Sequence, residues 1–209
     1  MSRKFISGLV IILFISLFSV SASAYTFNLI YEFDGALPVQ SYGTVDVMQN
    51  NGDLDFVVTA DTSTLGPNAD IHVLYFNLIN DFTGLNISTS NAPTTEYEII
   101  GPSPSVRGGA GAAFEWGVDF GPGGGSKGNG TLQLATFTLS ADQDLMVGDL
   151  LEFSDPNNTP PVILAIHFQN TYTPYDSETV GGTVPIPAAA WLLGTGLIGL
   201  IGLRKRFQH

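Results

Sequence analysis

Residues 53–60 read D-L-D-F-V-V-T-A, and this stretch decides how the middle of the chain is interpreted. Apolar and polar residues alternate at its start, and aromatic and β-branched residues dominate it, as is typical of a β-strand with one buried face. The sequence Asn50-Asn51-Gly52 comes directly before it and is a strong turn signal. The stretch therefore predicts a short strand that follows a tight turn.

Further segments of the chain share this composition, and Gly, Pro and Asn residues that favour turns separate them. They are residues 26–33, 71–79, 96–100, 113–120, 132–140 and 162–170. No stretch between them has a sustained helical apolar repeat, although residues 140–150 could hold one helical turn. Short strands joined by turns predict an all-β fold, with an antiparallel β-sandwich or jelly-roll-like body over residues 25–170.

The inward-facing positions of these strands are expected to carry the large apolar side chains of one core. The predicted core residues are Phe56, Val58, Val73, Tyr75, Phe114, Trp116, Phe120, Leu134, Phe137, Ile163, Ile166 and Phe168. About 160 residues lie between the apolar blocks at the two ends of the chain, which is enough to bury a substantial core.

The charges are distributed unevenly along the 209 residues. Five of the seven basic residues are terminal, and they are Arg3, Lys4, Arg204, Lys205 and Arg206. The body between them carries all 19 acidic residues with only Arg107 and Lys127, which gives a net charge of −17. Such a surface repels phosphate backbones, so we expect no nucleic-acid binding. The chain has no cysteine, which excludes disulfides, thiolate metal sites and Cys nucleophiles.

Residues 1–24 have the three parts of a secretory signal peptide. Arg3 and Lys4 supply positive charge, residues 5–20 are mostly apolar, and Ala22-Ser23-Ala24 is an A-x-A cleavage site. We predict an N-terminal signal helix that signal peptidase removes after Ala24, so that the body is exported. The alternative is an uncleaved membrane anchor, for which the apolar run is short.

The C-terminal segment reads V-P-I-P-A-A-A-W-L-L-G-T-G-L-I-G-L-I-G-L-R-K-R from Val184 to Arg206. Residues 187–203 carry no charge and are predicted to form a transmembrane helix, in which glycine is common. Arg204, Lys205 and Arg206 provide a stop-transfer signal, which predicts that this end faces the cytoplasm and that the body lies outside.

Four features together resemble the PEP-CTERM sorting domain: the signal peptide, a Pro-X-Pro motif, a glycine-spaced apolar helix and a terminal basic cluster. The resemblance covers residues 184–207, and the residues that match the sorting and cleavage motif are Val184, Pro185, Ile186 and Pro187. The family's motif is Pro-Glu-Pro, and in this V-P-x-P variant Ile186 stands at its middle position.

The resemblance implies recognition by exosortase, a membrane protease-transpeptidase of Gram-negative bacteria. It further implies a transient anchor in the inner membrane with the body in the periplasm. Release then takes the body to the outer surface or the extracellular matrix, in association with exopolysaccharide and biofilm. The alternative is a membrane-anchored periplasmic protein whose tail is never cut.

Residues 171–183 are polar and contain Tyr, Pro and Gly. We interpret them as a linker that holds the body away from the membrane. The predicted organisation is therefore a signal peptide over 1–24, a β body over 25–170, a linker over 171–183 and a sorting segment over 184–207.

Candidate metal ligands are few. His72 and His167 lie in strand-like runs, but spacing places no third ligand, and isolated strand histidines are mainly structural. The D-L-D run at 53–55 and the D-Q-D run at 142–144 could present paired carboxylates to calcium, yet no EF-hand loop is present. We therefore expect no metal site and no cofactor, with calcium as the alternative.

We expect a non-catalytic body, because the sequence has no nucleophile elbow and no phosphate-binding glycine motif. The alternatives are a sugar-binding module displayed at the cell surface and a cell-wall hydrolase that uses two carboxylates. The cleft of a hydrolase would usually carry exposed aromatic residues, whereas Trp116, the only Trp of the body, is expected in the core. A sugar-binding module would instead present aromatic residues on one face of a sheet. The candidate residues for such a face are Tyr31, Tyr42, Tyr75, Tyr97, Tyr172 and Tyr175.

Overall fold

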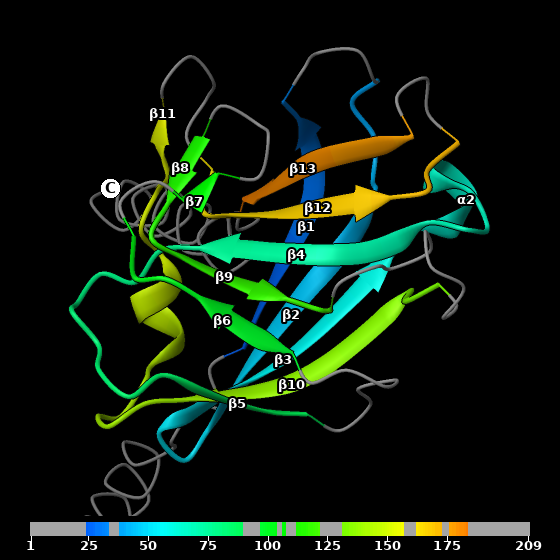
Figure 1. Cartoon of the computed structure of the whole chain (residues 1–209). Coiled ribbons are helices and arrows are strands. Elements are labelled where there is room, and N and C mark those ends of the chain that lie inside the picture. Colours follow the sequence, from blue (N-terminus) through cyan, green and yellow to red (C-terminus); the bar gives the residue numbers. More distant parts are fainter. Residues whose placement is uncertain are drawn as a thin grey trace, which may run out of the picture.

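Antiparallel β-strands make up most of the protein (Figure 1), as the computed structural model shows. The structure describes residues 24–33, 38–89, 97–103, 106–107, 112–121, 131–156, 162–172 and 176–183. The prediction of an all-β, antiparallel fold is confirmed.

Ten of the strands form one nearly closed sheet. In spatial order they are β5 (Asn86–Thr89), β10 (Leu134–Ser140), β3 (Asp53–Ala60), β2 (Gly43–Asn50), β1 (Ala24–Glu32), β13 (Ser177–Thr183), β12 (Leu164–Gln169), β4 (Asp70–Phe76), β9 (Trp116–Asp119) and β6 (Glu98–Ile100). The edge strands β5 and β6 approach each other without pairing, so that the sheet curls around one interior.

Local sequence explains the turn and the helical pieces. Asn51 and Gly52 join β2 to β3 with φ angles of 49° and 93°, the positive values that a type I′ hairpin turn requires. The short helix α2 (Thr62–Leu65) is capped by Asp61, whose side chain accepts a hydrogen bond of 3.0 Å from the Ser63 backbone N–H. A 3-10 turn, η1 (Val147–Leu150), lies in the stretch for which a helical turn was predicted.

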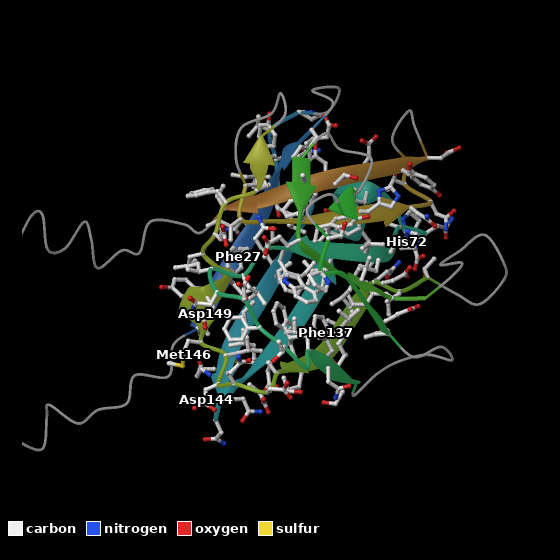
Figure 2. All side chains as sticks on the ribbon, turned by 60° about the vertical axis from the view of Figure 1, so that its left-hand side comes forward. Phe27, His72, Phe137, Asp144, Met146 and Asp149 are labelled. Atoms are coloured by element: carbon white, nitrogen blue, oxygen red, sulfur yellow. The ribbon has the colours of Figure 1, made fainter. Side chains whose placement is uncertain are left out.

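The interior of the sheet holds a large apolar cluster, called the inner cluster below, to which nearly every strand contributes. The Phe56 and Phe137 rings stack in it, with centroids 4.7 Å apart. Figure 2 shows Phe27 and Phe137 within the curved sheet, whereas Asp144 lies at its rim. Alternation along β10 turns Phe137 inward.

The predicted core residues are buried, with one exception. Leu134 is 47% exposed, so its assignment to the core was wrong. It is the first residue of β10, and the alternation that directs Ala135, Phe137 and Leu139 inward leaves Leu134 at the surface.

A second, smaller cluster lies on the outer face of the sheet and is called the outer cluster below. A three-stranded sheet of β7 (Val106–Arg107), β8 (Ala112–Phe114) and β11 (Asp155–Pro156) accompanies it. The Tyr75 and Phe114 rings stack with centroids 5.8 Å apart. Among the described residues, the buried members of the cluster are Phe33, Val73, Tyr75, Phe114, Val162 and Ala165. The prediction that Val73, Tyr75 and Phe114 face inward was therefore wrong: the alternation along β4 turns Leu74 and Phe76 to the interior and leaves Val73 and Tyr75 on the outer face, where Phe114 packs.

The interpretation of residues 171–183 as a linker was wrong for the last seven residues, which form β13. This strand pairs with β1 on one side and with β12 on the other, and most of its residues are buried. Gly181 and Gly182 allow close packing, since a Cβ at Gly181 would lie 2.7 Å from Val162 Cγ1. The β body therefore extends to Thr183.

The start of β1, the first strand, and the end of β13, the last strand, lie at the same end of the sheet. In the antiparallel pair β1 and β13, Asn28 lies opposite Thr183, and β1 begins four residues earlier at Ala24. We call this end, at which β1 begins and β13 ends, the proximal end, and the opposite end the distal end (Figure 1).

Within the described ranges, no helix has the length and apolar character needed to cross a membrane. The predicted transmembrane helix over 187–203 lies outside these ranges, as does the predicted signal helix apart from Ala24.

Candidate functional site

A pocket of about 350 Å³ opens at the proximal end of the sheet. It is formed by the loop after β4, the loop after β6 and the residues between β8 and β9. Its volume is at the lower end of the range for small-molecule sites, about 300–1,000 Å³. The residues that line it are Asn80, Asp81, Phe82, Thr83, Pro102, Ser103, Glu115 and Trp116.

Asn77, at the end of β4, ties the walls of this pocket together. Its side chain is 5% exposed, and its Oδ1 accepts a hydrogen bond of 2.7 Å from the Glu115 backbone N–H. Its Nδ2 donates to the Phe153 carbonyl at 3.1 Å. The Ser103 backbone N–H donates to the Glu115 carbonyl at 3.0 Å. Three separate segments are thereby held around Glu115, which is one of the two acidic residues that line the pocket.

The loop after β4 is held on its other side by the segment that contains η1. Asn80 Nδ2 donates to Asp149 Oδ1 at 3.2 Å, and Thr83 Oγ1 donates to Asp142 Oδ2 at 3.0 Å. The Ile79 backbone N–H donates to the Asp149 carbonyl at 2.9 Å. Side chains on both flanks of the loop therefore fix the positions of Asp81 and Phe82 between them.

The pocket combines an apolar wall with negative charge. Phe82 is 9% exposed and Trp116 is 7% exposed, so both rings are held firmly by the packing behind them. Burial raises the pKa of the Glu115 carboxyl, and the nearby charges of Glu152 and Asp81 raise it further. The lining residues that the structure describes include no basic side chain. Such a surface suits a polar ligand that has an apolar face and carries positive rather than negative charge.

The structure brings together the two histidines that the sequence singled out. His72 on β4 and His167 on β12 have ring centroids 5.5 Å apart. Gln169 Nε2 lies 3.1 Å from His72 Nδ1, and Thr179 Oγ1 lies 3.0 Å from His167 Nδ1. Burial, helped by the proximity of His72, lowers the pKa of His167 to about 4, so this ring is neutral near pH 7.

The surroundings of the two histidines and of the acidic runs bear on the question of a metal site. In the part of the chain that the structure describes, no three His, Asp or Glu side chains are placed to hold a metal ion together. The acidic runs at 53–55 and 142–144 have other partners. Asp55 accepts hydrogen bonds from Thr138 Oγ1 at 2.6 Å and from Asn50 Nδ2 at 3.0 Å. Asp142 accepts from Thr83, as described above.

The tyrosines that were candidates for a sugar-binding face are spread over the fold. Tyr42 and Tyr97 are buried in the inner cluster, while Tyr75 is buried in the outer cluster and Tyr31 packs against it. Tyr172 is 71% exposed beyond β12, and residue 175 lies outside the described ranges. The structure thus places the aromatic wall of a pocket at Phe82 and Trp116 instead.

Sequence reasoning missed the pocket, although one signal for it is present. The run Asn80-Asp81-Phe82-Thr83 places an aromatic residue among polar ones in a loop. Its partners Ser103 and Glu115 are distant in the sequence, so only the fold joins them.

The residues assigned to sorting and stop-transfer lie outside the described ranges. They are Val184, Pro185, Ile186, Pro187, Arg204, Lys205 and Arg206. Of the predicted signal cleavage site, Ala22 also lies outside these ranges, whereas Ala24 is the first residue of β1. Comparison of the chain with family models, curated proteins and solved structures gave no match.

Proposed function

We propose that the protein is an exported, non-catalytic component of a Gram-negative cell surface or extracellular matrix, associated with exopolysaccharide or biofilm. The signal peptide over 1–24 directs export and is removed by signal peptidase. The segment over 184–207, which resembles a PEP-CTERM sorting domain, then holds the body at the inner membrane until exosortase cuts near its V-P-I-P motif.

The observation that carries this proposal is that a complete run of paired strands lies between the two predicted cleavage sites. Within the described residues, the first strand runs from Ala24, the predicted site of signal cleavage, and the last strand runs to Thr183, next to Val184. Cleavage at the two predicted sites would remove one terminal residue of β1 and nothing from β13. Processing at both positions is therefore compatible with an intact sheet.

The proximal end is where the body would be attached to the membrane before release. Because β1 begins and β13 ends there, the predicted membrane segment would leave the body at that end. The anchored body would then stand with its distal end away from the membrane. The buried strand β13 leads directly to the sorting motif, so that the motif follows a rigid element rather than a long linker.

Intact-mass analysis of the mature protein tests the sorting step. In a host with exosortase, we expect a chain that begins at Tyr25 and ends close to Val184–Pro187. Replacing Pro185 and Pro187 by Ala should leave the full C-terminal segment attached, because proline keeps a cleavage segment extended and unpaired. The matched control is Pro67→Ala, which changes a proline within the body.

The outcomes separate the proposal from its alternative. A mature wild-type chain that still ends at His209 in the exosortase host contradicts sorting and supports a membrane-anchored periplasmic protein. A chain that begins before Tyr25 contradicts cleavage after Ala24 without affecting the C-terminal step.

A second function, carbohydrate binding, is supported by the pocket at the proximal end. Its lining joins the aromatic wall of Phe82 and Trp116 to the hydroxyl, amide and carboxylate groups that bind sugar hydroxyls. The body would in that case be a sugar-binding module whose ligand is the polysaccharide of the matrix.

The β-sandwich or jelly-roll-like arrangement also remains a proposal. It is supported by ring contacts across the interior between strands that are not neighbours in the sheet. Phe56 on β3 lies 6.4 Å from Phe76 on β4, measured between ring centroids. Phe137 on β10 lies 5.9 Å from Phe120, the residue after β9. Such contacts are expected when two halves of a curved sheet pack face to face, as in a sandwich.

A further inference from the structure

We propose that the pocket at the proximal end binds an amino sugar with a free, protonated amine, as a residue of a cationic polysaccharide. This inference rests on the proposed sugar-binding function and adds the charge of the ligand to it. The pocket itself, with its apolar wall and its fixed polar groups, carries the argument.

The charge of the pocket excludes an acidic ligand and favours a cationic one. Among the described residues that line it, Asp81 and Glu115 are acidic and none is basic. Glu115 lies close enough to Asp81 and to Glu152 for both charges to raise the pKa of its carboxyl, after the larger effect of burial. A protonated amine near Glu115 would neutralise this repulsion, whereas a uronic acid would increase it.

The remaining groups favour a sugar over a simple cation. Asn80, Thr83 and Ser103 offer amide and hydroxyl groups at the surface of the pocket. Phe82 and Trp116 supply an apolar wall for the C–H face of a sugar ring, and an aromatic ring also attracts a nearby ammonium group. A bare divalent ion would use neither the wall nor the hydroxyl groups, since it is bound by clustered oxygen ligands.

The pocket is prepared for binding because its walls are already fixed. Asn77 holds Glu115 and the segment at Phe153 in place, and Asp149 and Asp142 hold the loop that carries Asp81. A ligand that enters such a site loses little affinity to ordering of the protein. Glu115 itself follows Phe114 of the outer cluster and precedes Trp116 of the inner cluster, so the chain on both sides of it is anchored.

Isothermal titration calorimetry of the full-length chain in detergent micelles tests the inference. The probes are glucosamine tetramers, N-acetylglucosamine tetramers, galacturonate tetramers and putrescine. We expect the glucosamine tetramer to bind most tightly and the galacturonate tetramer not to bind. Glu115→Gln and Asp81→Asn should each weaken binding of the glucosamine tetramer by about tenfold, or 1.4 kcal/mol.

The matched control is Glu98→Gln. Glu98 is an exposed carboxylate on β6 outside the pocket lining, so this variant changes the net charge equally and should bind as the wild type does. Thermal melting of all variants checks that they fold. Because Glu115 is already in an unfavourable environment as an anion, we expect Glu115→Gln to melt no lower than the wild type.

Each other outcome overturns a defined part of the inference. Equal binding of the glucosamine and N-acetylglucosamine tetramers overturns the charge preference but leaves sugar binding intact. Absence of binding by every tetramer overturns both. Putrescine binding as tightly as the tetramer overturns the sugar and leaves a cation site. An equal loss of binding in Glu98→Gln assigns the effect to the acidic surface as a whole and overturns the site.

Discussion

The inner and outer clusters lie on opposite faces of the same sheet and differ in how they are built. The inner cluster draws buried residues from strands along nearly the whole length of the sheet. The outer cluster has six buried members among the described residues, and they come from a few neighbouring segments and from Phe114 of β8. The first cluster therefore determines whether the sheet forms, whereas the second determines where the small sheet of β7, β8 and β11 is attached.

The pocket lies where the two clusters meet. Phe114 is buried in the outer cluster and Trp116 in the inner one, and Glu115 stands between them with its carboxylate at the pocket. A loop residue that faces solvent is thus held by aromatic anchors on two faces of one sheet. Substitutions in the two clusters should consequently have different effects on the fold and on the pocket.

The largest effect is expected for Phe137→Ala. Removing a ring that stacks on Phe56 leaves a cavity in the inner cluster, which costs about 3–5 kcal/mol of the free energy of unfolding. Urea denaturation followed by fluorescence measures this loss. The control is Leu134→Ala on the same strand, which should cost less than about 1 kcal/mol because Leu134 is half exposed. Equal losses for the two variants would contradict the assignment of the inner cluster.

Phe114→Ala should have a smaller effect on stability and a larger one on the pocket. It removes the ring that stacks on Tyr75 and costs about 2 kcal/mol, since the small cluster can partly collapse. We expect faster hydrogen exchange in β8 with little change in β3 and β10. Uniformly faster exchange across the large sheet would show that the two clusters are not separable.

Substitutions of the adjacent glycines Gly181 and Gly182 in β13 allow the packing on the two faces of the sheet to be compared directly. A Cβ at Gly181 would lie 2.7 Å from Val162 in the outer cluster, and a Cβ at Gly182 would lie 3.1 Å from Leu164 in the inner cluster. Gly181→Ala should cost about 1–3 kcal/mol and Gly182→Ala less, because only the first forces a stiff side chain to move. Gly148→Ala is the control, since nothing lies within 4 Å of its added Cβ. Thermal melting ranks the three variants, and a lower melting temperature for Gly182→Ala than for Gly181→Ala would reverse the expected order.

The smallest expected effect concerns pH and His167. Its folded-state pKa of about 4 is below its ordinary value of 6.5, so the unfolded chain binds the proton more readily. Stability should therefore fall as the pH is lowered from about 6.5 to 4, by roughly 1–2 kcal/mol for this partly shielded group. His167→Gln should flatten the pH dependence of the melting temperature in this range. The raised pKa of buried Asp70 makes the free energy of unfolding rise as the pH falls, which is the opposite of the effect of His167. Asp70 is present in both the wild type and His167→Gln, so it does not account for a difference between them. An unchanged pH dependence of the melting temperature in His167→Gln would therefore contradict the role of His167.

The strands that the sequence predicted are those with a clear alternation or a turn signal at their start. Residues 53–60 coincide with β3, and Phe137 and its alternate neighbours lie on β10 as expected. The alternation at Val45 and Val47, ahead of Asn51-Gly52, is a local signal of the same kind for β2. These features are local, so a single sequence contains them.

The parts that sequence reasoning missed depend on distant neighbours. Glu178, Thr179, Gly181 and Gly182 have the composition of a linker, and only the strands on either side explain why they are buried in β13. The pocket was missed for the same reason, because Asn77 joins loops that come from separate parts of the chain. The prediction for Leu134 was wrong in the opposite way, because it placed an exposed residue in the core. An apolar residue at the start of a strand need not face the core.

The position of β13 sets the time at which the protein can fold. This strand comes last among the ten in the chain, yet it lies in the middle of the sheet, between β1 and β12. When the chain is synthesised or exported from its N-terminus, β1 becomes available early. One edge of β1 stays unpaired until the residues of β13, which run to Thr183, are also available. Completion of the sheet is consequently a late event in the emergence of the chain. Any machinery that acts just after Thr183 meets a body that has only then become able to close.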